Sequence, residues 1–274
     1  MQANKYFQLA ALCAALGASA VANAALVYDG NVTSNFINGT GVTNGGFTIG
    51  TANGVEIGLR ARERYTNPVG GIYTPTNDWN SNGDGTYSHA AGGFTPVPST
   101  ANGTAGGPLA AWVFDWSINT GTANLGNAGY TYRMGIDYNP GVGTAFLEFD
   151  PINLTCADHS FGNSSTAQSG GARIANCAAI GASVAYGLLA SGNNLVQNSW
   201  NLGFSVFNLP GFPFDPNADG NYSVFLEARN ANGAVTRSDI TVIVGRGATV
   251  PEPGTLALAG LALAGLGFAR RRRA

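Results

Sequence analysis

A short stretch of the sequence spaces carboxylate and amide side chains as the opening of a calcium-binding loop does. It reads D-x-N-x-D-G and supplies Asp215, Asn217 and Asp219. Calcium prefers oxygen ligands, and side chains two residues apart in a tight glycine-containing turn can converge on one ion. The spacing makes these three residues candidate metal ligands, and calcium a candidate cofactor.

A second stretch, D-x-N-x-N-G, begins at Asp78. An EF-hand would close each loop with a bidentate glutamate, but that place holds Leu226 in the first stretch and His89 in the second. Neither loop is therefore an EF-hand. The same residues also form Asx turns before strands, and this alternative stays open.

Three aromatic residues, Trp79, Tyr87 and Phe94, fall in a segment that reads as a long loop, 67–108. Exposed aromatic rings on a β-sandwich can stack on sugars, as in many carbohydrate-binding modules, although fold analogy alone is weak support. The alternative is that these rings pin the loop onto the domain.

Residue types suited to catalysis are few. The only histidines are His89 and His159, and the run Asp158-His159-Ser160 holds triad residue types, but sequence neighbours do not by themselves form a spatial relay. The G-x-S-x-G and H-E-x-x-H motifs are absent. Three carboxylates could serve a glycosidase, although strand alternation also explains them as solvent-facing charges: Asp137, Glu148 and Asp150. We expect no enzymatic activity.

The elements that must position these residues are strands. Apolar residues alternate with polar ones through most of the chain, which is typical of half-buried antiparallel strands. Residues 54–62, for example, place Val55, Ile57 and Leu59 on one face, with Arg60 and Arg62 on the other. The predicted strands cover 26–28, 47–50, 54–62, 111–119, 129–139, 145–149, 196–206, 222–229 and 235–244.

This pattern predicts an all-β fold, a single antiparallel β-sandwich with Greek-key or jelly-roll connections or an immunoglobulin-like topology. An Asn-Gly turn between the last two strands predicts a hairpin there. Long polar loops are expected at 67–108 and 153–172. The alternative is a pair of small sandwiches divided near 164–171.

Two of the three cysteines are candidates for a disulfide. Cys13 lies near the N-terminus, and the remaining two, Cys156 and Cys177, enclose a segment rich in Ser, Gly, Ala and Asn. Such an even pair predicts a disulfide wherever the compartment is oxidising. No C-x-x-C or Cys/His spacing supports a metal or redox site instead.

Charge excludes one class of function. The chain of 274 residues is only 10% charged, and its one lysine, Lys5, lies near the N-terminus. Between Ala25 and Val250 there are eight Arg against fourteen Asp and Glu, a formal net charge of −6. An acidic, lysine-free segment lacks the electrostatic surface that nucleic acids require.

The N-terminus reads as a secretory signal peptide. Lys5 precedes an apolar run from Leu9 to Val21, which ends in Ala22-Asn23-Ala24. A basic start, a short apolar helix and an A-x-A site are its three parts. Residues 1–24 are therefore expected to direct the chain to the Sec export machinery and then to be removed.

The C-terminus has three parts in order: Pro251, Glu252 and Pro253, an apolar run from 254 to 269, and the four arginines Arg270, Arg271, Arg272 and Arg273. As a helix the run would span about 24 Å, short of a hydrocarbon core of about 30 Å. We expect a weak transmembrane helix whose arginines hold its end in the cytoplasm. A simple membrane anchor is the alternative reading.

This arrangement resembles the PEP-CTERM sorting signal, and the resemblance is confined to this C-terminal segment. It implies recognition by an exosortase, a membrane cysteine protease, and transient insertion in the inner membrane of a Gram-negative bacterium that makes extracellular polysaccharide. The expected organisation is a signal peptide (1–24), a β-sandwich domain (25–249) and a sorting signal (250–274). The expected function is a non-catalytic structural or adhesive role at the cell surface or in the extracellular matrix. Alternatives are a polysaccharide-binding module, with calcium as a candidate cofactor, and an exported hydrolase.

Overall fold

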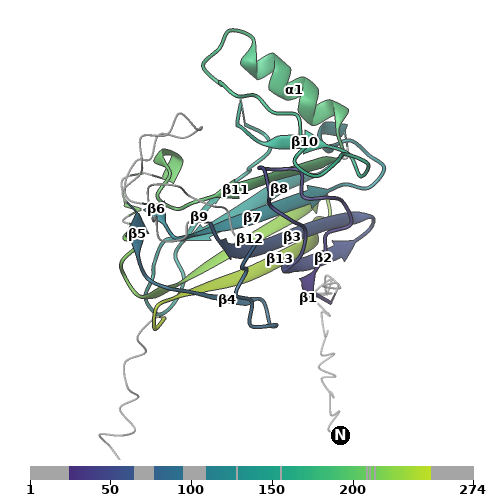
Figure 1. The fold of residues 1–274 in the computed structure, drawn as a ribbon. Helices are drawn as coiled ribbons and strands as arrows, with labels where there is room; N and C mark the ends of the chain where they lie inside the picture. The colour runs from purple at the N-terminus through teal and green to yellow at the C-terminus, as the bar shows by residue number, and fades with distance from the viewer. Residues whose placement is uncertain are drawn as a thin grey trace, which may run out of the picture.

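The computed structural model describes residues 25–64, 77–94, 109–127, 129–154, 156–207, 209, 211–212 and 214–247. Within them, two β-sheets pack face to face, and one short α-helix lies outside the sheets (Figure 1). The expected signal peptide and the C-terminal sorting signal, with its apolar run and arginines, lie outside the described residues. Within the described ranges, no helix has the length and apolar character needed to cross a membrane.

The first sheet has six strands in the order β1-β2-β3-β7-β11-β10, and its neighbours pair antiparallel. Its strands are β1 (Val27–Gly30), β2 (Phe47–Ala52), β3 (Val55–Glu63), β7 (Trp112–Asn119), β11 (Leu195–Trp200) and β10 (Ser160–Gly162).

The second sheet has five strands in the order β4-β13-β12-β8-β9. Its strands are β4 (Thr86–His89), β13 (Gly233–Val244), β12 (Gly220–Asn230), β8 (Thr131–Asp137) and β9 (Phe146–Phe149). The remaining elements are short: β5 (Gly93–Phe94), β6 (Leu109–Ala110), η2 (Leu125–Asn127), η3 (Ser205–Phe207) and α1 (Ala182–Gly192).

The predicted β-sandwich is confirmed in its coarse form, and every predicted strand overlaps an observed one. The strand expected over 196–206 ends early, at Trp200. The chain turns there because the Asn201 side-chain amide donates to the carbonyls of Ala110 and Trp112, at 2.8 and 3.0 Å. The segment that follows forms η3 instead of extended backbone.

The expectation of purely antiparallel pairing is wrong at one place. β4 pairs parallel with β13, and it lies in the five-stranded sheet although β3, which precedes it in the chain, lies in the six-stranded one. The two long loops are also interrupted by structure, since β4 and β5 lie in the first and β10 in the second. The helix α1 was not predicted at all.

The core between the sheets is built by alternation along the central strands. On β7, the side chains of Trp112, Phe114 and Trp116 face the second sheet and are at most 1% exposed. Burying a side chain of this size stabilises the fold by roughly 1.5–3 kcal/mol. Facing them on β12 are the buried side chains of Tyr222, Val224, Leu226 and Ala228.

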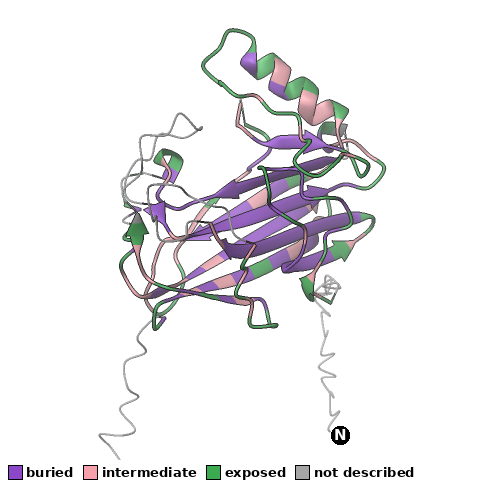
Figure 2. Ribbon diagram, viewed as in Figure 1, coloured by how far each residue is buried: buried purple, intermediate pink, exposed green. Residues whose placement is uncertain are grey.

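The division into two small sandwiches near 164–171 does not match the strand pairing. β7 pairs with β11, and β8 pairs with β12, so strands from both sides of that stretch share each sheet. The described residues therefore form one sandwich. Figure 2 shows that β7, in the six-stranded sheet, is buried along its whole length, whereas buried residues alternate with more exposed ones along much of β13 in the five-stranded sheet.

Candidate functional site

The densest polar cluster lies on the outer face of the six-stranded sheet, the face turned away from the core. Because side chains alternate along a strand, β3 sends Arg60 and Arg62 to this face and β7 sends Asp115. The register places Arg60 directly opposite Asp115. All three side chains are at most 2% exposed, although the sequence pattern indicated a half-buried sheet with a solvated polar face.

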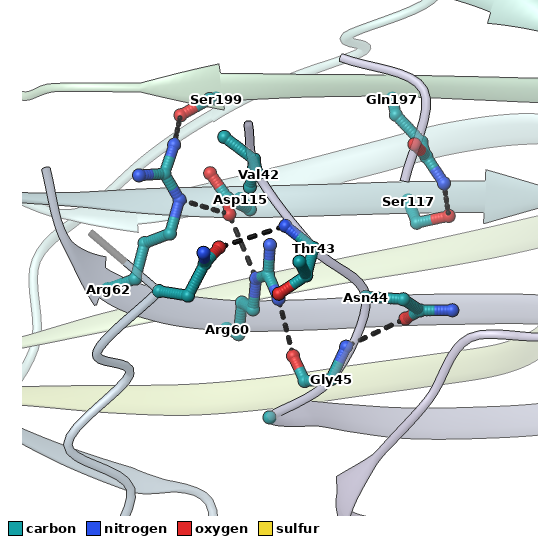
Figure 3. A network of polar contacts seen from close by, with 12 residues as sticks. Val42, Thr43, Asn44, Gly45, Arg60, Arg62, Asp115, Ser117, Gln197 and Ser199 are labelled. Carbon is teal, nitrogen blue, oxygen red and sulfur yellow. Dashed lines mark hydrogen bonds and ion pairs between the residues drawn. The ribbon is translucent and has the colours of Figure 1, made fainter. Parts of the chain in front are cut away.

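Asp115 holds the two arginines together (Figure 3). Its Oδ2 accepts hydrogen bonds from Arg60 Nε at 2.9 Å and from Arg62 Nε at 2.8 Å, and Arg60 Nη1 also donates to the carbonyl of Gly45. Burial alone would raise the pKa of Asp115, but the charges of Arg62 and Arg60 lower that pKa below its usual value. The carboxylate is therefore ionised and compensates buried positive charge.

A segment without regular secondary structure, residues 31–46, covers this face; we call it the strap. The side chain of Gln197 on β11 accepts a hydrogen bond from the backbone N–H of Ile37 at 2.6 Å. The carboxylate of Glu56 on β3 accepts from the backbone N–H of Thr33 at 3.0 Å. Polar side chains of the sheet thus replace water as partners of the strap backbone.

Apolar side chains of the strap, of β2 and of the segment before β4 together seal the cluster. Three aromatic rings surround the Arg60 guanidinium, with ring centroids at 4.8 Å for Phe36, 4.3 Å for Phe47 and 4.8 Å for Trp79. Gly58 lets the strap approach, because a Cβ there would lie 2.7 Å from the side chain of Val32. The cage stabilises the buried cation through the negative faces of the rings.

A disulfide-closed loop holds the strap from outside. Cys156 and Cys177 form the predicted disulfide, with Cα atoms 5.6 Å apart. Within the loop that they close, the backbone N–H of Ser169 donates to the carbonyl of Phe36, and that of Gly171 donates to the carbonyl of Ile37, each at 3.2 Å. The disulfide therefore restrains the loop that packs on the strap.

The calcium-loop residues make contacts within the protein. Asp215 Oδ1 accepts from the backbone N–H of Asn217 at 2.9 Å, and Asn217 Oδ1 accepts from that of Gly93 at 3.0 Å. Asp219 Oδ2 accepts from Arg246 Nε at 2.8 Å, and this hydrogen bond lowers the pKa of Asp219. Arg246 thus occupies one of the two carboxylate oxygens that Asp219 could offer a calcium ion. Among the described residues, no group of three or more His, Cys, Asp or Glu is placed to hold a metal.

The second candidate calcium loop, which begins at Asp78, contains an Asx turn before a strand, as its alternative interpretation predicted. Asp84 Oδ1 accepts hydrogen bonds from both the backbone N–H and the hydroxyl of Thr86, at 2.9 and 2.7 Å. The side-chain amide of Asn82 donates to the same hydroxyl at 2.8 Å. These bonds lead the chain into β4.

Of the three candidate stacking residues, the structure describes the side chains of two, Tyr87 and Trp79. Tyr87 is 0% exposed, and its hydroxyl donates to the carbonyl of Gly46 at 2.8 Å. Burial raises the pKa of Tyr87 to about 12, and the ring presents no face to a ligand, so the prediction is wrong for this residue. Trp79 is half-buried against Gly46 and Arg60. The side chain of Phe94 lies outside the described residues.

Both histidines are buried. His159 Nε2 donates to the carbonyl of Pro151 at 2.7 Å, so its Nδ1 accepts from the side-chain amide of Asn198 at 2.8 Å. Burial lowers the pKa of His159 to about 4 and that of His89 to about 4. At neutral pH both rings are therefore uncharged.

The Asp158-His159-Ser160 run does not assemble a relay. Both ring nitrogens of His159 are already engaged, and the Ser160 hydroxyl donates to Asn38 at 2.8 Å. Asp158 accepts from the side-chain amide of Asn198 at 3.3 Å instead of from the imidazole. In a hydrolase triad the nucleophile hydrogen-bonds to the base, and the base hydrogen-bonds to the orienting carboxylate. The side chains of Ser160, His159 and Asp158 are bonded to other groups instead.

The outer face of the five-stranded sheet carries a second charged cluster, which has no such cover. Glu227, 3% exposed, lies between Arg133 at 2.9 Å, Arg229 at 2.6 Å and Arg237 at 3.5 Å. The arginine side chains are 32–39% exposed, and Phe225 lies under the guanidinium groups of Arg133 and Arg237. On this face the carboxylate is buried, whereas the arginines that surround it remain partly exposed to water.

Two packed sheets, one with a sealed outer layer, define the described part of the chain as a sandwich-like β protein. Residues 249–273 match the family model of the PEP-CTERM protein-sorting motif, which confirms the resemblance found in the sequence. The motif implies an exported protein that an exosortase sorts to the cell surface, and the disulfide is consistent with a location outside the cytoplasm. No curated protein and no solved structure matches the chain.

Proposed function

We propose that the domain is a non-catalytic structural or adhesive component of the cell surface or extracellular matrix, released from a transient inner-membrane anchor in a Gram-negative bacterium. The observation that carries this proposal is the use of its polar residues. Arg60, Arg62 and Asp115 are buried and bonded to one another, and the candidate catalytic histidine has both nitrogens occupied by protein groups. These residues therefore stabilise the β-sandwich and its outer layer, as expected for a structural protein.

Durability suits a protein that works outside the cell. The disulfide between Cys156 and Cys177 restrains the loop over the strap, and the strap in turn seals the buried charges. We therefore expect that removing the disulfide or one of the buried charges lowers the stability of the domain and abolishes no reaction. The sorting motif supplies the route by which the domain would reach the surface.

The test is a deletion strain complemented with variants. We expect loss of matrix cohesion or surface attachment in the deletion strain, and recovery with the full chain. A His159→Gln chain that reaches the surface should restore the phenotype, because the imidazole has a structural role. Cleavage of the producer's polysaccharide by the purified full chain, lost in His159→Gln, would contradict the proposal and support the hydrolase alternative.

A polysaccharide-binding role remains a separate prediction. Trp79 is its remaining described residue, and Trp79→Ala would also open the cage around Arg60. Binding must therefore be compared with Phe36→Ala, which opens the same cage at a residue that was never a stacking candidate. Loss of binding to the producer's polysaccharide in Trp79→Ala alone, with both variants folded, would support this role.

A further inference from the structure

The sequence contains six tripeptides of the form N-x-S/T, the acceptor signal for N-glycosylation of exported proteins. They begin at Asn31, Asn38, Asn102, Asn153, Asn163 and Asn221. Glycosylation replaces a hydrogen on the side-chain nitrogen Nδ2, and the signal also requires the hydroxyl two residues later. Such tripeptides arise by chance in a chain rich in Asn, Ser and Thr. The structure decides which of them offers both groups to an enzyme.

The two tripeptides of the strap are bonded into the fold. Asn38 is 9% exposed, and its Oδ1 accepts a hydrogen bond from the Ser160 hydroxyl at 2.8 Å. Asn31 is exposed, but Thr33, which completes its tripeptide, donates through its backbone N–H and its hydroxyl to buried Glu56, at 3.0 and 3.1 Å. An enzyme could engage that hydroxyl only by pulling the strap off the sheet.

Two further tripeptides are blocked in other ways. The Nδ2 of Asn153 donates to Asp150 Oδ2 at 2.6 Å, so the acceptor nitrogen is already engaged. Asn221 is half-buried in β12, where it pairs with Ile243 of β13. A residue within a sheet cannot enter an active site without breaking the backbone hydrogen bonds of its strand. The tripeptide at Asn102 lies outside the described residues.

The tripeptide at Asn163 lies in an accessible place. It follows β10 directly, at the edge of the six-stranded sheet (Figure 1), and residues 163–165 are all exposed. The backbone N–H of Asn163 donates to Thr166 Oγ1 at 2.9 Å, and the N–H of Thr166 donates to the Asn163 carbonyl at 2.9 Å. The acceptor residue therefore belongs to an exposed, hydrogen-bonded turn.

The side chain of Asn163 leaves its nitrogen to a partner. Its Oδ1 accepts hydrogen bonds from the backbone N–H of Ser165 at 3.0 Å and from the Ser165 hydroxyl at 2.6 Å. These bonds hold the carboxamide beside the hydroxyl, and these are the two groups that the acceptor signal specifies. Within the described part of the chain, Nδ2 of Asn163 has no hydrogen-bond partner.

The loop that carries this turn is held in place. Asn163 lies between Cys156 and Cys177, in the loop whose Ser169 and Gly171 bond to the strap. An oligosaccharide on Asn163 would extend into solvent from that loop. It would also cover an exposed segment of small and polar residues, the kind of segment that proteases cut first.

We propose that Asn163 is an N-glycosylation site, which receives an oligosaccharide from a polyprenyl-diphosphate carrier after export. Nδ2 attacks the anomeric carbon of the first sugar, and a C–N bond forms as the C–O bond to the diphosphate breaks. Polyprenyl diphosphate leaves with the bonding electron pair, and one amide proton passes to a base of the transferase. The sorting motif implies export, which brings the chain to the compartment of such a transfer. The inference does not depend on the proposed structural role.

Peptide mass spectrometry of the full chain, purified after export by its producing cell, tests the proposal. After reduction, trypsin releases residues 134–173 as one peptide, since no Lys or Arg lies between Arg133 and Arg173. We expect this peptide to carry added sugar masses, and its fragments to place them on Asn163. Asn163→Gln should remove the added mass completely. The matched control is Asn153→Gln, which removes the other tripeptide of the same peptide and should leave the added mass in place.

Two variants of Ser165 separate the acceptor signal from the folding of the turn. Ser165→Ala keeps Asn163 but lacks the hydroxyl, so the added mass should disappear, whereas Ser165→Thr keeps a hydroxyl and should retain it. Formation of the disulfide between Cys156 and Cys177 in each exported variant shows that the loop has folded. An unmodified wild-type peptide would overturn the proposal. So would an added mass that persists in Asn163→Gln or in Ser165→Ala, because the sugar would then be attached elsewhere or by another rule.

Discussion

The outer faces of the two sheets carry similar clusters of arginine and carboxylate side chains, but the clusters differ in their exposure to water. On the six-stranded sheet, Asp115 and two arginines are sealed under the strap, with exposures of 0–2%. On the five-stranded sheet, Glu227 binds three arginines that remain about one-third exposed. Breaking an arginine–carboxylate pair should therefore cost more stability on the six-stranded sheet than on the five-stranded sheet, because water can replace a lost partner only at the open face.

The largest expected effect is a difference in stability between variants of Asp115 and of Glu227. Asp115→Asn leaves two buried guanidinium groups without compensation, and we expect it to lower the free energy of unfolding by about 3–5 kcal/mol. Glu227→Gln, the matched change on the open face, should cost about 1 kcal/mol, because its arginines regain water. Urea unfolding of both variants measures the two costs. Equal costs would show that the strap does not isolate its cluster from solvent.

The next largest effect concerns the disulfide that restrains the loop packed on the strap. Replacement of Cys156 and Cys177 by serine should lower the free energy of unfolding by about 3 kcal/mol, the value for a loop of this length. The hydrogen bonds to Phe36 and Ile37 should then open more often, so protease cuts should appear first within 31–46. Cuts on the five-stranded sheet instead would contradict this order of opening.

Acid should destabilise the interior beneath both faces. His159 and His89 have folded pKa values lowered to about 4, so they bind protons more weakly in the folded state than in the unfolded state. Their contribution to stability is complete above pH 6.5 and is lost as the pH falls toward 4, by about 1.4 kcal/mol per pH unit for each histidine.

The slope of unfolding free energy between pH 6 and pH 4.5 provides the measurement of this effect. In His159→Gln the slope should fall by up to about 1.4 kcal/mol per pH unit, because one of the two histidine protons is removed from the linkage. Burial raises the pKa of Glu56, so this carboxyl contributes with the opposite sign in both chains. A slope that stays the same would mean that other groups titrate in this range. Asp115 is not among them, because the charges of Arg62 and Arg60 hold its pKa below the ordinary value of 3.8.

The smallest effect concerns salt. Raising sodium chloride to about 1 M should reduce the cost of Glu227→Gln below about 0.5 kcal/mol, because exposed charges are screened. The cost of Asp115→Asn should stay the same within error, because no salt ion reaches a sealed pair. Unfolding curves at the two salt concentrations provide the comparison. A salt-dependent cost at Asp115 would argue for water inside the cluster.

The sequence predicted the strands well because alternation is a local property. Residues 54–62 assign Val55, Ile57 and Leu59 to the core face, and the structure confirms that assignment. Alternation could not show that Arg60 and Arg62 would be buried as well, because their cover comes from residues distant in the chain. The strap contains no alternation, and its contacts depend on long-range partners such as Gln197.

The helix was missed for a related reason. Residues 182–192 mix small and apolar residues without a polar face, so they lack the amphipathic pattern that signals a surface helix. The disulfide was predictable, because only two cysteines follow the expected signal peptide. The burial of Tyr87 was not, because its segment resembled a polar loop and the strand β4 within it has only four residues.

The central claim is that the strap is a closed second layer on the six-stranded sheet and not a surface loop. Amide hydrogen exchange tests it most directly at Ile37, whose N–H donates to buried Gln197. We predict exchange as slow as at Trp116 in the central strand β7, and faster exchange in Asp115→Asn. Exchange at Ile37 at the rate of an exposed turn amide, such as that of Asn232, would contradict the account.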